Sequence, residues 1–191
     1  MAWQVHPVTP ERFDDFAAVI NPTRNPRHCW CLSPRLRAAD IAALGGGDRE
    51  LAMRALCERK HPPGVVAYLD DVPVGWCNIG PRREIPRLVS STRIPALDDL
   101  PVWSILCVVV RTGFRRQGVT GVLLAGAVDY ARSAGAPAVE AYPVDPTGRM
   151  NATMAFVGTR SMFERAGFEV VGVTQATSGH LPRIIMRRVL A

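Results

Sequence analysis

The chain has 191 residues, of which 48% are hydrophobic and 21% charged, proportions typical of one soluble globular domain. This composition excludes global disorder, a collagen-like repeat and a coiled coil. The longest largely apolar runs, 105–110 and 119–128, are far shorter than the ~20 residues of a membrane-spanning helix. Because the N-terminus also lacks the pattern of a secretion signal, we expect a cytoplasmic protein without a membrane partner.

The charge balance favours an anionic partner. The formal net charge is +6, and every one of the 23 basic side chains except Lys60 is Arg. Arg stays charged and binds phosphate through paired hydrogen bonds, so a polyphosphate cofactor or a nucleic acid would both fit. The five cysteines are odd in number and irregularly spaced, which favours reduced thiols in the cytoplasm.

The first part of the chain, residues 1–63, is predicted to be mainly helical. A short strand is expected at 3–8. Helices follow at 11–20, 36–44 and 48–60, with Asp48 as the N-cap of the last one. Three prolines and a His-Cys-Trp-Cys cluster predict a loop over 21–34.

The second part, residues 64–191, alternates between strands and helices. Expected in chain order are strands at 65–69 and 74–79 joined by a hairpin turn, a long, partly helical loop over 81–100, a buried strand at 102–110, a helix at 119–134, a strand at 138–144, a helix at 159–166, and strands at 168–173 and 183–190. This order indicates one α/β (α+β) domain. Its sheet is expected to be mixed, mostly antiparallel and about seven-stranded, with helices on both faces.

The turn before the helix at 119–134 is basic and contains several glycines. Residues 111–121 read RTGFRRQGVTG. A helix N-terminus presents unpaired N–H groups and partial positive charge, glycines let an anion approach them, and Arg adds full charge. The turn therefore predicts a pyrophosphate site, although it matches neither the P-loop nor the dinucleotide-binding pattern.

This strand, turn and helix resemble the GNAT superfamily of acyl-CoA-dependent N-acyltransferases. The family signature is [Gln/Arg]-x-x-Gly-x-[Gly/Ala], and residues 115–120, RRQGVT, match it except at Thr120, which Gly121 follows. Residues 161–168, SMFERAGF, resemble the family's terminal helix-Gly-Phe element. The resemblance extends over about 65–190 and implies a single GNAT-like domain over 1–191, with an acyl-CoA-binding core at 64–191.

The resemblance also implies a reaction. Acetyl-CoA would be the co-substrate, with no metal, and a primary amine of a small molecule or protein would attack the thioester directly. The pantetheine arm would lie between the strands at 102–110 and 138–144. The expected oligomeric state is a monomer or homodimer. The implied cofactor-binding residues are Val108, Val109, Val110, Arg115, Arg116, Gln117, Gly118, Val119, Thr120 and Gly121.

The family's usual catalytic groups do not transfer. Phe163 stands where many members have a Tyr acid, and the strand position that sometimes carries a Glu base maps near Ser104. Tyr142 and Glu140 share one face of the strand at 138–144, so they are candidates for acid and base. Alternatively, Tyr142 packs in the core and Glu140 pairs with an Arg. The predicted catalytic residues are Tyr142, Ser104 and Glu140, and Asp145 or Asn151 could substitute for the family's polar groups.

Four other features leave alternatives open. Cys107 is either a nucleophile or, as favoured here, a small buried hydrophobe. The His28, Cys29 and Cys31 cluster lacks the second ligand pair of a structural zinc site, and Trp30 within it is a candidate lid over the acceptor pocket. Four arginines of the 81–100 loop either recognise an acidic acceptor or form a solvated surface: Arg82, Arg83, Arg87 and Arg93.

Two other functions compete with catalysis. A non-catalytic acyl-CoA-binding sensor would have the same fold but would not transfer the acyl group. The absence of the family's Tyr acid is the reason to consider this hypothesis. A nucleic-acid-binding protein is less well supported, because basic residues form no run longer than two and aromatic residues do not alternate with them.

Overall fold

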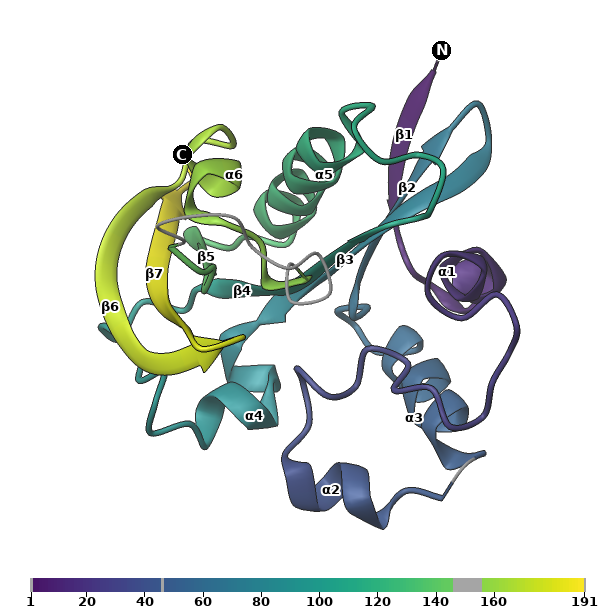
Figure 1. Cartoon of the computed structure of the whole chain (residues 1–191), viewed down its shortest axis with the longest axis horizontal. Helices are drawn as coiled ribbons and strands as arrows, with labels where there is room; N and C mark the ends of the chain where they lie inside the picture. Colours follow the sequence, from purple (N-terminus) through teal and green to yellow (C-terminus); the bar gives the residue numbers. More distant parts are fainter. Residues whose placement is uncertain (1, 46, 146–155, 191) are drawn as a thin grey trace.

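The computed structural model describes residues 2–45, 47–145 and 156–190 (Figure 1). In this part of the chain a seven-stranded sheet has the order β1-β2-β3-β4-β5-β7-β6. The strands are β1 Trp3–Pro7, β2 Gly64–Leu69, β3 Val72–Pro81, β4 Trp103–Val110, β5 Ala138–Ala141, β6 Glu169–Ser178 and β7 Leu181–Val189. Among these described strands, β4 and β5 are the parallel pair and the other neighbours are antiparallel, which confirms the predicted mixed sheet.

Helices cover both faces of the sheet, as predicted (Figure 1). One face carries α5 and α6, whose apolar side chains share a core with the inner strands. The other face carries the remaining helices. The helix bounds are α1 Phe13–Ile20, α2 Ala38–Ala43, α3 Asp48–Cys57, α4 Pro86–Val89, α5 Val119–Ser133 and α6 Arg160–Glu164, with short 3-10 helices at η1 Pro10–Arg12 and η2 Arg82–Glu84. Among the described residues, no helix is both long and apolar enough to span a membrane.

Local differences from the predicted elements have local causes. The hairpin between β2 and β3 turns over only Asp70 and Asp71, both at positive φ (47° and 64°), as in a two-residue type I′ turn. Asp48 is not the N-cap of α3. It is the first residue of that helix, and its carboxylate accepts a hydrogen bond from the Gly45 N–H at 3.0 Å.

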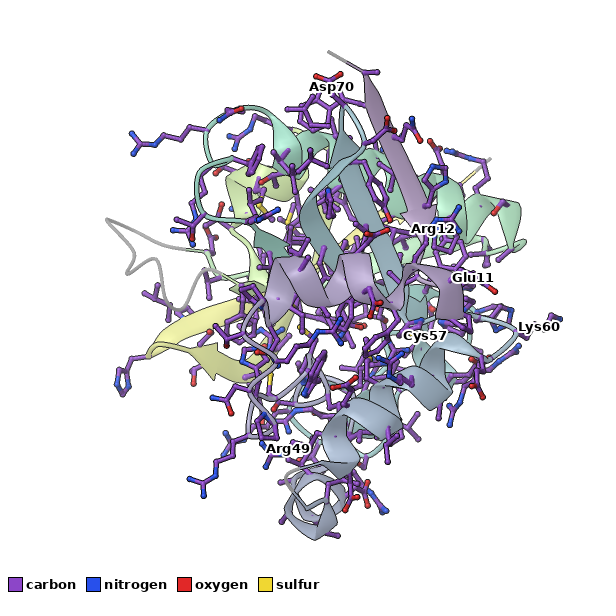
Figure 2. All side chains as sticks on the ribbon, turned by 90° about the vertical axis from the view of Figure 1, so that its right-hand side faces the viewer. Glu11, Arg12, Arg49, Cys57, Lys60 and Asp70 are labelled. Carbon is purple, nitrogen blue, oxygen red and sulfur yellow. The ribbon has the colours of Figure 1, made fainter. Side chains whose placement is uncertain are left out.

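Residues from the first part of the chain build a separate core on the α1 face. Phe13 and Phe16 of α1 pack with Trp76 of β3 and with Trp30, which is fully buried. Figure 2 looks onto this face, where α1 and α3 lie in front of the strands and Lys60 projects at the outer edge. The prediction that Trp30 covers an acceptor pocket is therefore wrong, because its indole ring is a core side chain.

Helix α5 packs so closely on β1 that one of its residues must be glycine. A Cβ on Gly126 would overlap the side chain of Val5. We expect Gly126→Ala to lower the free energy of unfolding by about 1–3 kcal/mol through overpacking. Urea denaturation of the ligand-free protein measures this change.

The matched control is Gly121→Ala on the same helix, where a Cβ would meet nothing within 4 Å. Here the better helix propensity of Ala should leave stability unchanged or raise it by up to about 1 kcal/mol. Equal destabilisation by both variants would contradict the proposed close packing of α5 against β1.

Candidate active site

The two parallel strands separate soon after they meet. β4 and β5 pair over Trp103–Ile105 and Val139–Ala141 only. β4 then continues beside β3 with one extra residue, Leu106, because Asn78 pairs with Cys107 while Ile79 pairs with Ile105. Such a bulge bends a strand and is frequent beside active sites. Beyond Ile105, the β5-facing edge of β4 therefore has no strand partner in the described part of the chain.

A cavity of about 1110 Å³ opens at this separation. Its walls come from the second half of β4, the N-terminus of α5, and α6 with the turn after it. Nine of the ten predicted cofactor-binding residues line it: Val108, Val109, Val110, Arg115, Arg116, Gly118, Val119, Thr120 and Gly121. The exception is Gln117, whose side-chain amide donates to the Gly113 carbonyl at 3.0 Å and so holds the turn.

The N-terminus of α5 is arranged to bind an anion. Gly118 is its N-cap at φ 84°, no side chain caps the helix, and its first turn holds no acidic residue. A Cβ on either Gly118 or Gly121 would meet nothing within 4 Å, so a ligand can reach the unpaired N–H groups. Arg115 and Arg116 are exposed beside them, without a carboxylate partner in the described residues.

The three predicted catalytic side chains meet in one buried cluster. Ser104, Glu140 and Tyr142 are each at most 2% exposed. The Tyr142 hydroxyl donates to Glu140 Oε2 at 2.9 Å, lies 3.0 Å from Ser104 Oγ, and accepts from Arg82 Nη1 at 2.7 Å. Burial, and then the negative charge of Glu140, raise the pKa of the Tyr142 phenol. The phenol therefore keeps its proton well into alkaline solution.

Both carboxylate oxygens of Glu140 are engaged. Oε2 accepts from Tyr142, and Oε1 accepts from Arg187 at 2.7 and 3.0 Å. Arg187 also forms a bidentate pair with Asp98, whose hydrogen bonds raise the pKa of the guanidinium. Of the two alternatives for Glu140, a general base or a partner of an Arg, the structure shows the pairing with an Arg. Sequence reasoning missed Arg187, and it considered Arg82 only as an acceptor-binding or solvated residue, whereas Arg82 bonds to Tyr142. These contacts depend on chain pairing, such as the register of Glu140 with Arg187.

No member of this cluster lines the first cavity. Tyr142 is the residue after the last one of β5, where that strand leaves β4. Glu140 and Arg82 line a second cavity of about 680 Å³, together with His61 and Trp103. The cluster therefore spans from the divergence of the strands to a second opening near the start of β4.

The other candidates have ordinary structural surroundings. Phe163 is fully buried and packs against Phe168, and it has no proton to donate. Cys107 is 4% exposed in an apolar cluster. Asp145 pairs with Arg160 at 3.2 Å, and Asn151 lies outside the described residues.

The thiols near His28 have raised pKa values. A hydrogen bond between Cys29 and Cys31, and then burial, raise the pKa of Cys29. Contact with Cys107 is the main cause of the raised pKa of Cys31. A protonated thiol does not bind metal readily, and within the described ranges no group of three or more His, Cys, Asp or Glu side chains is placed to hold a metal ion.

Comparison with known proteins agrees with this geometry. The model of the acetyltransferase (GNAT) family matches residues 34–168. The chain belongs to the GNAT family. As a member of this acetyltransferase family, it is an acetyltransferase enzyme. A search of curated proteins found no match.

Solved structures with the same fold include three acetyltransferases at low identity. The PaiA N-acetyltransferase of Thermoplasma acidophilum, in complex with coenzyme A, is 14% identical over 100% of both chains (TM-score 0.54). Ribosomal-protein-alanine N-acetyltransferase from Brucella melitensis is 19% identical over 98% of this GNAT chain and 99% of the other (0.57). YncA of Salmonella typhimurium, a putative acetyltransferase with its cofactor acetyl-CoA, is 14% identical over 100% and 95% (0.54). At these identities, the likeness concerns the fold alone.

Proposed function

We propose that this GNAT enzyme transfers an acetyl group from acetyl-CoA to a primary amine of a small molecule or protein. The observation that carries the proposal is a single cavity that joins the unpaired edge of β4 to the uncapped N-terminus of α5. The two features suit the two ends of the cofactor, because strand edges bind amides and helix N-termini bind phosphates.

In the proposed complex, the pyrophosphate lies on the turn that contains Gly118. Arg115 and Arg116 supply positive charge, and the main-chain N–H groups at the start of α5 donate hydrogen bonds. The pantetheine arm follows β4 past Val110 and Val108, whose main-chain groups pair with its amides. This path brings the thioester to the end of the β4–β5 pairing, close to Tyr142.

The proposed chemistry is direct attack. The neutral amine nitrogen, formed by loss of the ammonium proton to solvent, bonds to the thioester carbonyl carbon, and the carbon–sulfur bond breaks. The leaving thiolate takes the proton of the Tyr142 phenol, and the resulting phenolate takes the proton that the acylated nitrogen loses. Tyr142 is the proposed proton donor, because its phenol stays protonated and sits where β5 leaves β4. Glu140 and Ser104 hold the phenol in place through their hydrogen bonds to its hydroxyl. Glu140 is itself fixed, because its other carboxylate oxygen accepts from Arg187.

A non-catalytic acyl-CoA sensor is the second candidate. Phe163, fully buried at the position of the usual acid, favours it. The expectations of a cytoplasmic location and of a monomer or homodimer also remain predictions.

One experiment separates these functions. The protein is incubated with acetyl-CoA and a panel of primary amines, acetylated products are detected by mass spectrometry, and acetyl-CoA binding is measured by calorimetry. We expect binding together with at least one acetylated amine. Binding without any product would favour the sensor, and absence of binding would reject the assignment of the cavity.

A further inference from the structure

The strand next to β5 directs an arginine toward the proposed reaction site. Along β7, Ile184 and Met186 enter the core under α5, whereas Ile185 packs with Tyr142 on the opposite face. Alternation along the strand therefore places Arg183 on the face that carries Tyr142. The Arg183 Nε donates to the Tyr142 main-chain oxygen at 2.6 Å, which holds the guanidinium beside the end of β5.

This guanidinium has no carboxylate partner in the described residues. The neighbouring acid is Asp145, whose N–H bonds to the Pro182 carbonyl, but its carboxylate pairs with Arg160. The undescribed positions cannot supply an acidic side chain, because none of them is Asp or Glu. The guanidinium is half-buried, and burial lowers the pKa of Arg183 to about 10.

Arg35, a buried arginine, differs from the half-buried Arg183 in its hydrogen-bond partners. Arg35 also has a pKa lowered to about 10 by burial, but its Nη1 is surrounded by three acceptors, the Pro63 carbonyl, Asn78 Oδ1 and the Ile79 carbonyl. Arg35 is therefore satisfied by the fold. Arg183 donates only its Nε–H to a described residue, the Tyr142 carbonyl. Its two terminal nitrogens have no acceptor among the described residues.

A second positive charge lies near Arg183. Arg87 is exposed on α4, without a carboxylate partner among the described residues, and its charge acts on Arg183. Helix α4 lies next to the turn between β6 and β7 (Figure 1), and its Leu88 packs in the same cluster as Ile185. Two like charges would repel each other at this face, so an anion between them would be bound favourably.

We propose that Arg183, assisted by Arg87, binds a carboxylate of the acceptor, so that the substrates are small amines that carry a carboxylate, such as amino acids. The planar guanidinium matches a carboxylate through two parallel hydrogen bonds. A carboxylate held beside the main chain of Tyr142 keeps the amine of the same molecule near the thioester. This inference rests on the proposed function and deepens it by naming the substrate class. It also gives a role to Arg87, one of the loop arginines that the sequence left undecided.

The test compares matched amines. Each amino acid of a panel is paired with its carboxamide and with its decarboxylated amine, and kcat/KM is measured from CoA release. We expect the carboxylate member to exceed both neutral partners by about 10- to 100-fold, the range for a hydrogen-bonded ion pair. Arg183→Gln keeps a donor for the Tyr142 carbonyl without the charge and should abolish the preference. Arg87→Gln, on an exposed side chain, should reduce it without risk to folding.

The control is Arg132→Gln, which removes one positive charge from α5 on the opposite face and should leave the preference unchanged. The same kcat/KM comparison is made between phosphoethanolamine and ethanolamine. A preference for the phosphate that is stronger than the preference for the carboxylate would overturn the carboxylate assignment. Equal rates for acids and amides, or an unchanged preference in Arg183→Gln, would also overturn it while leaving amine acetylation intact.

A binding measurement makes the proposal testable without turnover. N-acetyl amino acids and their amides are added to the CoA-bound protein, and the rise in Tm is compared. We expect a larger rise with the acids in the native protein and no difference in Arg183→Gln. No difference in the native protein would overturn the proposal. Failure to acetylate any amine, with this difference present, would instead reject the proposed function.

Discussion

Replacing Tyr142 with Phe is expected to lower kcat about 10²- to 10⁴-fold, the range for loss of a general acid. The raised pKa of the phenol keeps the donor form present above about pH 10, the ordinary value for Tyr. The native enzyme should therefore not lose kcat through deprotonation of Tyr142 as the pH rises to about 10. Steady-state kinetics on an amine found by the panel measures both effects.

Cys107→Ala is the comparison variant for this experiment. The thiol is buried in an apolar cluster, so its truncation should reduce stability more than kcat. Thermal unfolding of both variants shows whether each is folded at the assay temperature. If Tyr142→Phe keeps full kcat while folded Cys107→Ala is inactive, direct attack is wrong and an acyl-cysteine intermediate must be considered.

Replacing Gly118 with Asp should abolish the rise in Tm that acetyl-CoA produces. At a concentration of 100 times Kd, a ligand stabilises the folded state by about 2.7 kcal/mol. A carboxylate about 4 Å from a phosphate charge repels it by about 4 kcal/mol at an effective dielectric constant of about 20. The carboxylate–phosphate repulsion therefore exceeds the stabilisation that the ligand provides. A side chain at Gly118 has room for this effect, because it would extend into open space beside the helix N-terminus.

Gly118→Asn is the matched control, because the residue has φ 84° and any side chain there is strained. Asn has nearly the shape of Asp, tolerates positive φ and carries no charge. Thermal scans with and without acetyl-CoA should show a lower Tm for both ligand-free variants, but a ligand-induced rise only for Asn. The same rise in the Asp variant would place the phosphates elsewhere.

The members of the buried polar cluster around Tyr142 depend on one another. Tyr142 is held by a cation and faces an anion, and each of those partners has further contacts. The arrangement fixes the hydroxyl between Arg82 and Glu140, so a change in one member alters the surroundings of the others. Effects of substitutions within this cluster should therefore be non-additive.

The sequence by itself determined the elements whose causes are local. Apolar spacing predicts α5, Gly135 follows it at φ 79°, and the chain folds back at Gly167 so that Phe168 meets Phe163. The anion-binding turn could also be predicted, because a helix N-terminus acts through its own backbone and the residues immediately before it. Together with the strand order and the resemblance to the GNAT family, these features predicted the fold, and nine of the residues predicted to bind the cofactor line one cavity.

Only the tertiary structure decided which side chains meet. β5 was expected to reach Val144 but ends at Ala141, since pairing with β4 stops there and Val144 forms only isolated bridges within the described residues. Trp30 enters the core because α1 and β3 enclose it. Arg187 reaches Glu140, and Arg183 reaches the main chain of Tyr142, through the register of β7. Such contacts join residues tens of positions apart, so they follow from strand pairing and packing and not from any local pattern.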